Sequence, residues 1–416
     1  MSVLAPLRHT PFRLLMAGRT ISALGNSFAP IALAFAVLDL TGSASDLGLV
    51  VGVRTVVNVV FLLFGGVLAD RLPKHLLMVG SSLAAAVSQA AVAGLVLTHS
   101  ATIPLLICLS AVNGMAGAVA MPTSMAILPQ TVPEQVRQQA NAINRLSLNS
   151  AAIIGAPVAG VVVAAVGPGW GIAVDAATFV LAALSFSLLR TPRPAETGKA
   201  ERPHIFADLL TGWSEFRSRT WLWVVVAGFC VLNAAWGGSL VVLGPVVADQ
   251  SFGRRGWGFV LAAQTAGMLL GGLLAMRLRL RRLLYFGVFA CLFMALPPLV
   301  LGVYPHLWLL IVAALAAGLM LEQFGIAWET TMQEHVPPDK LARVYSYDMV
   351  GSFVAIPVGE IAIGPISQAA GLEPTLIGAA VLIALAVFGM LSSRDVRTLP
   401  HKLPEPAAGT VEESVA

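Results

Sequence analysis

Twelve apolar runs alternate with short polar segments along most of the chain. A membrane-spanning helix needs about 20 predominantly apolar residues, and these runs are too long and too uniformly apolar for the strands of a membrane barrel. We therefore predict an all-α membrane protein with twelve transmembrane helices. The runs cover residues 14–38, 47–69, 76–97, 104–127, 143–166, 172–189, 221–246, 256–276, 283–302, 307–331, 344–367 and 375–392.

The composition favours the same class of protein. Apolar residues make up 57% of the 416 residues and charged residues only 11%, against roughly 25% charged residues in soluble domains. The seven histidines fall in loops, tails or at their edges, with no spacing that builds a metal site. The chain also has no Gly-x-x-x-x-Gly-Lys-Ser/Thr motif for binding phosphate. We expect no metal, no cofactor and no enzymatic activity.

Positive charges alternate between the two sides of the predicted helices. Lysines and arginines concentrate in the N-terminal arm, the central linker, the tail and every second connection. Only Arg254 and Arg255 fall in connections on the other side. The positive-inside rule therefore predicts that both termini lie in the cytoplasm. The net charge of +4 follows from this bias, and we do not expect nucleic-acid binding.

A long polar stretch near the middle of the chain separates two groups of six runs. Within it, Ile205, Leu209, Trp213 and Phe216 have helical spacing, which predicts an amphipathic helix on the inner leaflet between residues 204 and 217. The predicted parts are an N-terminal half, a cytoplasmic linker, a C-terminal half and a flexible cytoplasmic tail, at residues 1–190, 191–220, 221–393 and 394–416.

The two halves repeat each other. A shift of 204 residues superimposes Val132-Pro133 on Val336-Pro337 and Gly160 on Gly364. Paired glycines and prolines are stronger evidence than paired apolar residues, which match easily by chance. We therefore predict two parallel six-helix halves.

The short connection between the second and third runs carries a charged motif. It reads Gly66-x-x-x-Asp70-Arg71-x-x-Lys74, in a turn of about six residues. This pattern resembles the signature loop of the major facilitator superfamily. The resemblance implies a transporter with its substrate site between the halves. It also implies that these four residues form a gating motif, with Asp70 at the inner mouth beside the start of the eleventh helix.

The fifth predicted helix carries a second motif, formed by Gly155, Pro157 and Gly160. It is similar to the Gly-Pro-x-x-Gly-Gly motif of proton-coupled exporters in the superfamily, although Ala156 and Val161 replace two of its glycines. Other segments resemble the bacterial branch that holds the enterobactin exporter and macrolide efflux proteins, in which an Asp often stands where this chain has Asn26. These segments are Phe12-Arg13-Leu14-Leu15, Leu40-Thr41-Gly42-Ser43-Ala44 and Gly167-Pro168-Gly169-Trp170.

Three arginines lie within the apolar runs. A charge inside a membrane is costly, so each one is a candidate for function. Arg19 and Arg54 lie six or seven residues into their spans, on the order of 10 Å deep. The alternatives for them are snorkelling to the inner and outer interface, respectively, or a structural ion pair. Arg145, near the start of the fifth span, is expected to be an interface anchor.

Acidic residues within the spans are the candidates for proton coupling or substrate contact. Glu322 and Glu329 lie seven residues apart and therefore on one face of the tenth span. Glu322 is the deeper of the two and is the first candidate for the coupled proton, with an ion pair to Arg145 or Arg54 as the alternative. The other candidates are Glu360 in the eleventh span and Asp175, which we expect near the outer end of the sixth.

These patterns favour a secondary exporter that moves an amphipathic small molecule out of the cell in exchange for protons. Its apolar helices suit a hydrophobic cargo, such as a drug, an antibiotic or a siderophore-like product, better than a sugar or an ion. The alternatives are a proton-coupled uptake symporter of the same fold and a membrane sensor or scaffold that transports nothing. We expect a monomer in the bacterial inner membrane, driven by the proton gradient.

Overall fold

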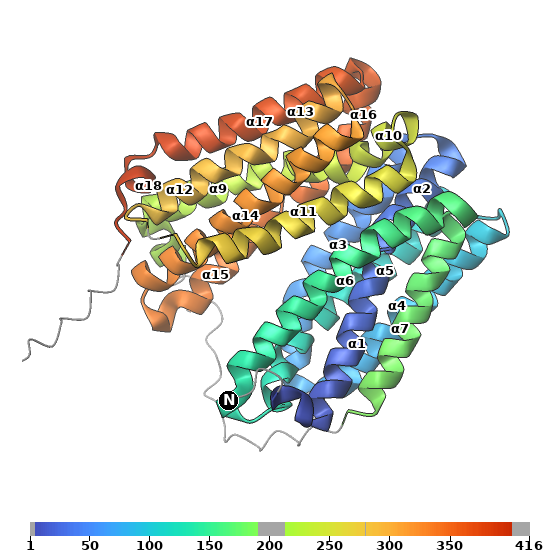
Figure 1. Cartoon of the computed structure of the whole chain (residues 1–416), viewed down its shortest axis with the longest axis horizontal. Helices are drawn as coiled ribbons and strands as arrows, with labels where there is room; N and C mark the ends of the chain where they lie inside the picture. Colours follow the sequence, from blue (N-terminus) through green and yellow to red (C-terminus); the bar gives the residue numbers. More distant parts are fainter. Residues whose placement is uncertain (1–4, 190–212, 279, 402–416) are drawn as a thin grey trace, which may run out of the picture.

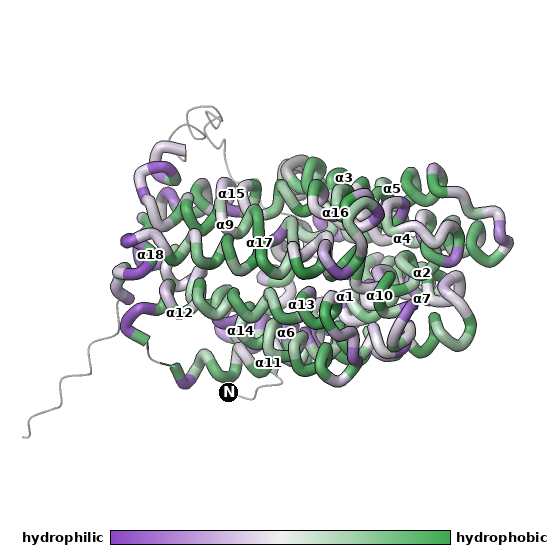
Figure 2. Tube along the Cα trace, turned by 90° about the horizontal axis from the view of Figure 1, so that it is seen from above, coloured by the Kyte–Doolittle hydropathy of each residue, from purple (hydrophilic) through white to green (hydrophobic). Residues whose placement is uncertain are grey.

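The computed structural model describes residues 5–189, 213–278 and 280–401. Within these ranges, twelve helical segments are long and apolar enough to cross a membrane, as predicted. Figure 1 shows two helical halves that meet at the end marked by α2 and α10 and diverge toward the end that carries the N-terminus and α15. Hydrophobic positions dominate the middle of the helices, and hydrophilic positions gather at the helix ends (Figure 2). The chain is a multi-pass membrane protein.

The first half contains six spans. A short break at Ser27 and Phe28 divides the first span into α1 and α2, just ahead of Pro30, which lacks the backbone N–H that a continuous helix needs. The helices are α1 (Thr10–Asn26), α2 (Ala29–Thr41), α3 (Ala44–Arg71), α4 (Lys74–Leu97), α5 (Ile103–Ile127), α6 (Arg137–Val166) and α7 (Pro168–Ser187), with 3₁₀ turns η1 (Ala5–Arg8), η2 (Leu128–Gln130) and η3 (Glu134–Val136).

The second half also contains six spans, three of which are interrupted near Pro245, Pro297 and Pro357. The first interruption is a π-helical stretch, η4, and the second is a 3₁₀ turn, η5. The elements are α9 (Thr220–Trp236), η4 (Gly237–Leu243), α10 (Gly244–Gln250), α11 (Gly253–Ala275), α12 (Leu283–Ala290), η5 (Cys291–Ala295), α13 (Leu296–Val303), α14 (Leu307–His335), α15 (Pro338–Phe353), α16 (Ile356–Ala370), α17 (Leu372–Ser392) and α18 (Arg394–Thr398).

Two pairs of helices, α3 with α16 and α6 with α11, hold the halves together. Small residues allow this close approach. A Cβ at Gly258 would collide with the carbonyl oxygen of Ala156, and one at Gly48 would collide with the carbonyl oxygen of Glu360. The halves are therefore in direct backbone contact at the end where they meet.

The connection between α3 and α4 is shorter than predicted. The backbone of α3 remains helical through Asp70 and Arg71, so only Leu72 and Pro73 link the two helices. Pro73 explains the end of α3, because a proline disfavours the helical conformation of the residue before it. The side chains of Asp70 and Arg71 and the surroundings of Gly66 lie outside what the structure describes.

The end of the central linker docks on the second half. Residues 213–218 are helical, and the rings of Trp213 and Phe216 lie 5.6 and 5.9 Å from that of Tyr347 on α15. Glu215 binds Lys340 and Arg219, and these cations lower its pKa. The rest of the predicted amphipathic helix, residues 204–212, lies outside the described residues.

Candidate functional site

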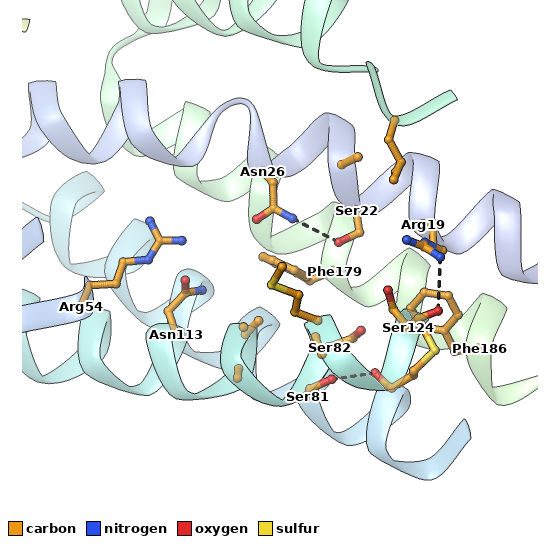
Figure 3. A pocket seen from close by; sticks show the side chains of 18 residues that line it. Arg19, Ser22, Asn26, Arg54, Ser81, Ser82, Asn113, Ser124, Phe179 and Phe186 are labelled. Atoms are coloured by element: carbon orange, nitrogen blue, oxygen red, sulfur yellow. Dashed lines mark hydrogen bonds between the residues drawn. The ribbon is translucent and has the colours of Figure 1, made fainter. Parts of the chain in front are cut away.

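A cavity of about 270 Å³ opens within the first half. Figure 3 shows Arg19 and Arg54 at opposite ends of it, with Asn26, Ser22 and Phe179 between them. The resemblance to the superfamily implied a site between the halves, whereas residues of the first half alone line this cavity. The lining residues are Arg19, Ser22, Ala23, Asn26, Arg54, Met78, Ser81, Ser82, Ala85, Asn113, Ala116, Gly117, Ala120, Met121, Ser124, Leu148, Phe179 and Phe186.

Arg19 projects from α1 into this cavity. Its Nη1 donates to the carbonyl oxygen of Ser124 on α5 over 3.3 Å. Among the residues that the structure describes, no carboxylate forms an ion pair with Arg19 or acts on its charge. The described part of the chain therefore contains no structural ion pair at Arg19.

Arg54, on α3, also points to the interior. It lines the first cavity and a second one, of about 370 Å³, to which both halves contribute. The charges of Asp175 and Glu360 act on its guanidinium group. The fold thus brings together one basic and two acidic residues from α3, α7 and α16, which the sequence did not predict as a group.

Asp175 is fully buried, at 0% exposure. It lies about two turns into α7, where α7 packs against α4. Gln89 on α4 donates its side-chain N–H to Oδ2 of Asp175, whereas Oδ1 has no hydrogen-bond partner among the described residues. A lone Gln inside an apolar run was the available signal for this contact.

Glu360 lies where the halves meet. It is on α16 in the second half, is 4% exposed, and lines the second cavity beside Arg54 and Thr55 of the first half. Thr55 shares a hydrogen bond with the carboxyl group, and Oε2 has no partner in the described part of the chain. A buried acid on one half therefore faces a cation on the other.

Glu322 and Arg145 form an ion pair between the halves, with 3.1 Å between Oε1 and Nη2. Arg145 therefore bridges the two halves. Its side chain is 71% exposed and that of Glu322 is 14% exposed. Arg145 lies about 16 Å along α6 from Ala156, where α6 touches α11. Glu329, one heptad from Glu322, is exposed.

A third charged contact joins the halves at the end where they meet. Arg254 on α11 binds Asp39 of the first half through both oxygens, with 2.8 Å between Nη1 and Oδ2, and also binds Asp249 over 2.8 Å. Its guanidinium group lies 4.8 Å from the ring centre of Phe35. Sequence reasoning missed this pair, because it treated Arg254 only as an outside charge.

The motif of the fifth span connects α6 to two neighbours. A Cβ at Gly155 would lie 2.7 Å from Cβ of Ser27, next to α1, and a Cβ at Gly160 would lie 3.0 Å from the carbonyl oxygen of Arg254 on α11. Pro157 lies inside the helix between them. The motif therefore lies where α6 contacts both its own half and the other half.

The described residues contain no group of three or more His, Cys, Asp or Glu side chains that could hold a metal ion. The arrangement combines twelve spans, two halves that diverge at one end, and buried charges at their contact. These features define a membrane transporter. The Major Facilitator Superfamily model matches residues 15–359, and the chain belongs to this family, whose members are transporters and not enzymes.

The relatives include two efflux proteins. The multidrug efflux pump Tap of Mycolicibacterium fortuitum is 25% identical over 398 residues, which cover 92% of this chain and 95% of Tap. The enterobactin exporter EntS of Escherichia coli K12 is 25% identical over 427 residues, covering 98% of this chain and 96% of EntS.

Solved structures show the same fold. A bacterial homologue of the lysosomal transporter Spinster has a TM-score of 0.72 at 15% identity, covering 93% of this chain and 97% of that one. The nucleoside transporter NupG has a TM-score of 0.74 at 13% identity, with 92% and 98% coverage.

Proposed function

We propose that this protein exports an amphipathic small molecule across the bacterial cytoplasmic membrane in exchange for protons. Two relatives that span nearly the whole chain are named as an efflux pump and an exporter. The charge bias of the connections favours a cytoplasmic position for both termini. In that orientation the halves diverge toward the cytoplasm (Figure 1), so cargo enters from inside the cell.

The observation that carries the proposal is the position of Glu360 at the contact between the halves. A carboxyl group is easier to bury in its neutral form than in its charged form. Closure of the outer end buries Glu360, and we propose that this step favours the protonated acid. We propose that Glu360 takes up a proton from outside while that end is open, and that the neutral acid allows the end to close. The proton then leaves toward the cytoplasm past Arg54, which lines both cavities, before the end reopens. The protein therefore returns inward with a proton and moves outward without one, as antiport requires.

Asp175 and Arg54 support this role of Glu360. Arg54 lines both cavities and lies within electrostatic reach of both acids, so the loss of a proton from one acid changes the field at the other. We therefore assign proton coupling to Glu360. The charges of Asp175 and Arg54 change how strongly Glu360 binds its proton. Glu322 is assigned to the ion pair with Arg145 instead.

Inverted membrane vesicles test the proposal. Dansylglycine and dansylcadaverine share a fluorescent ring and differ in charge, so together they serve as probes for a cargo of either charge. With an inside-acid gradient, vesicles that contain the protein should accumulate at least one probe above vesicles that lack it. Uptake of a probe by whole cells without accumulation in these vesicles would instead identify an importer.

Two matched variants isolate the coupling. Glu360→Gln keeps the size of the side chain but cannot release a proton, so accumulation should fall at least tenfold while exchange of probe without a gradient persists. Glu373→Gln, at an exposed position in the first turn of α17, should behave as wild type. Normal accumulation by Glu360→Gln would contradict the assignment.

A further inference from the structure

The charges around the cavity of the first half are unbalanced. Two guanidinium groups line it, and none of its eighteen lining residues is an aspartate or a glutamate. Arg54 is balanced, because Asp175 and Glu360 act on it. Arg19 has no such partner among the described residues. The cavity therefore carries a net positive charge at the Arg19 end.

Within the described residues, most of the hydrogen-bonding capacity of Arg19 is unused. A guanidinium group has five N–H donors in a planar fork, and the described contacts of Arg19 comprise one hydrogen bond, to the carbonyl oxygen of Ser124. The remaining donors lie at a cavity wall (Figure 3). Planar forks of this kind bind carboxylate and phosphate groups through two parallel hydrogen bonds.

The rest of the cavity suits a molecule that is polar along one side and apolar along the other. Hydroxyl and amide groups project into it from α1, α4 and α5, while rings and thioethers form its apolar wall. The polar groups belong to Ser22, Asn26, Ser81, Ser82 and Asn113, and the apolar ones to Met78, Met121, Phe179 and Phe186.

Building on the export function proposed above, we propose that the cargo is an amphipathic organic anion whose acidic group binds Arg19. The acid forms a paired hydrogen bond with the guanidinium group, and its apolar body lies against Phe179 and Phe186. This site is separate from Glu360, so the anion and the coupled proton do not compete for one group. They are linked through the change in conformation.

Equilibrium binding tests the inference without a gradient and without a direction of transport. Purified full-length protein in detergent at pH 7 is titrated with dansylglycine, which carries a carboxylate, and with dansylcadaverine, which carries an ammonium group. Dansylglycine should bind at least tenfold more tightly. Equal or weaker binding of dansylglycine, including no binding, overturns the proposal while the vesicle experiment still decides whether the protein exports.

Variants of Arg19 and Asn26 locate the site. Arg19→Gln should remove the preference for the anion, Arg19→Lys should retain part of it, and Asn26→Asp should weaken dansylglycine binding by placing a carboxylate in the cavity. Arg255→Gln, which removes the same charge at an exposed position, is the control. Thermal unfolding checks that each variant is folded, and a folded Arg19→Gln variant that binds dansylglycine normally overturns the assignment.

Anionic lipid offers the same chemistry as a soluble organic acid, so the titration is repeated with phosphatidylglycerol added to the detergent. Dansylglycine should remain bound. Its displacement by the lipid would assign Arg19 to a lipid headgroup and overturn its role in cargo binding.

Discussion

The two halves share one backbone plan but differ inside. The first half encloses the cavity, which Ala120 and Ser124 line from α5. A shift of 204 residues, the same shift that aligns the Val-Pro pairs, places Phe324 and Trp328 at these positions in α14. In the second half, Phe324 stacks on Phe229 with 4.1 Å between ring centres and also stacks on Trp328.

This difference shows how a repeated fold can divide its tasks. Small side chains leave room for cargo beside buried arginines in the first half, whereas aromatic rings fill the corresponding volume of the second. A filled bundle is stiff, since packed interiors deform little. We infer that the second half acts mainly as a rigid body and supplies Glu360 to the contact, while the first half binds the cargo.

The largest effect should come from filling the cavity as the second half does. In Ala120→Phe, a ring at the position of Phe324 occupies the space for cargo, so dansylglycine binding and vesicle accumulation should fall more than tenfold. Ala84→Phe, on an exposed face of α4, is the control. Wild-type binding by Ala120→Phe would show that cargo lies elsewhere.

The reverse exchange should affect stability more than transport. Phe324 is 7% exposed, and its replacement by Ala removes both stacked contacts, which should lower the free energy of unfolding by about 3 kcal/mol. Chemical unfolding in detergent measures this change, with Phe289→Ala at an exposed position as the control. A change in dansylglycine binding beyond twofold would argue against a purely structural role.

A smaller effect is expected from the ion pairs of Arg254. The Arg254 side chain is 21% exposed and that of Asp39 is 42% exposed, so solvent screens their ion pair. We expect its removal to destabilise the closed end by about 1 kcal/mol, which changes the ratio of closed to open molecules roughly fivefold. Arg254→Gln should therefore increase the fraction of molecules that are open at this end. Pulsed electron paramagnetic resonance measures the distance between spin labels at Leu40 and Gln250. The control variant Arg255→Gln should leave this distance unchanged.

The smallest effect is expected at the exposed ion pair. Glu322→Gln should change the free energy of unfolding by less than about 1 kcal/mol, because the Arg145 side chain is 71% exposed. Vesicle accumulation between pH 6 and 8 should remain near that of the wild type. A selective loss of accumulation would make Glu322 the proton carrier and remove that role from Glu360.

The number of spans and the repeat of the halves could be predicted because both depend on local sequence. Hydropathy marks each span, and matched glycines and prolines mark the repeat. Helix boundaries were less accurate, as the helical backbone at Asp70 and Arg71 shows. A charged residue near the membrane surface does not end a helix, and the proline at position 73 was the better signal.

The site could be predicted only in part. Buried charges are rare in membranes, so Arg19, Arg54, Asp175 and Glu360 stood out as candidates. Their grouping depends on which helices are neighbours, and periodicity within one helix does not contain that information. An ion pair between Glu322 and Arg145 was one of the alternatives for Glu322. The structure has this pair, although the two residues lie 177 positions apart in the sequence.

Protection of single cysteines tests most directly whether the first half binds the cargo. The native Cys108, Cys230 and Cys291 are first replaced by alanine. One new cysteine then replaces Ala116, which lines the cavity, or Met320, its counterpart at a shift of 204 residues. Saturating dansylglycine should slow alkylation at position 116 at least fivefold and leave position 320 unchanged. Equal protection at both positions, or stronger protection at 320, would contradict the account.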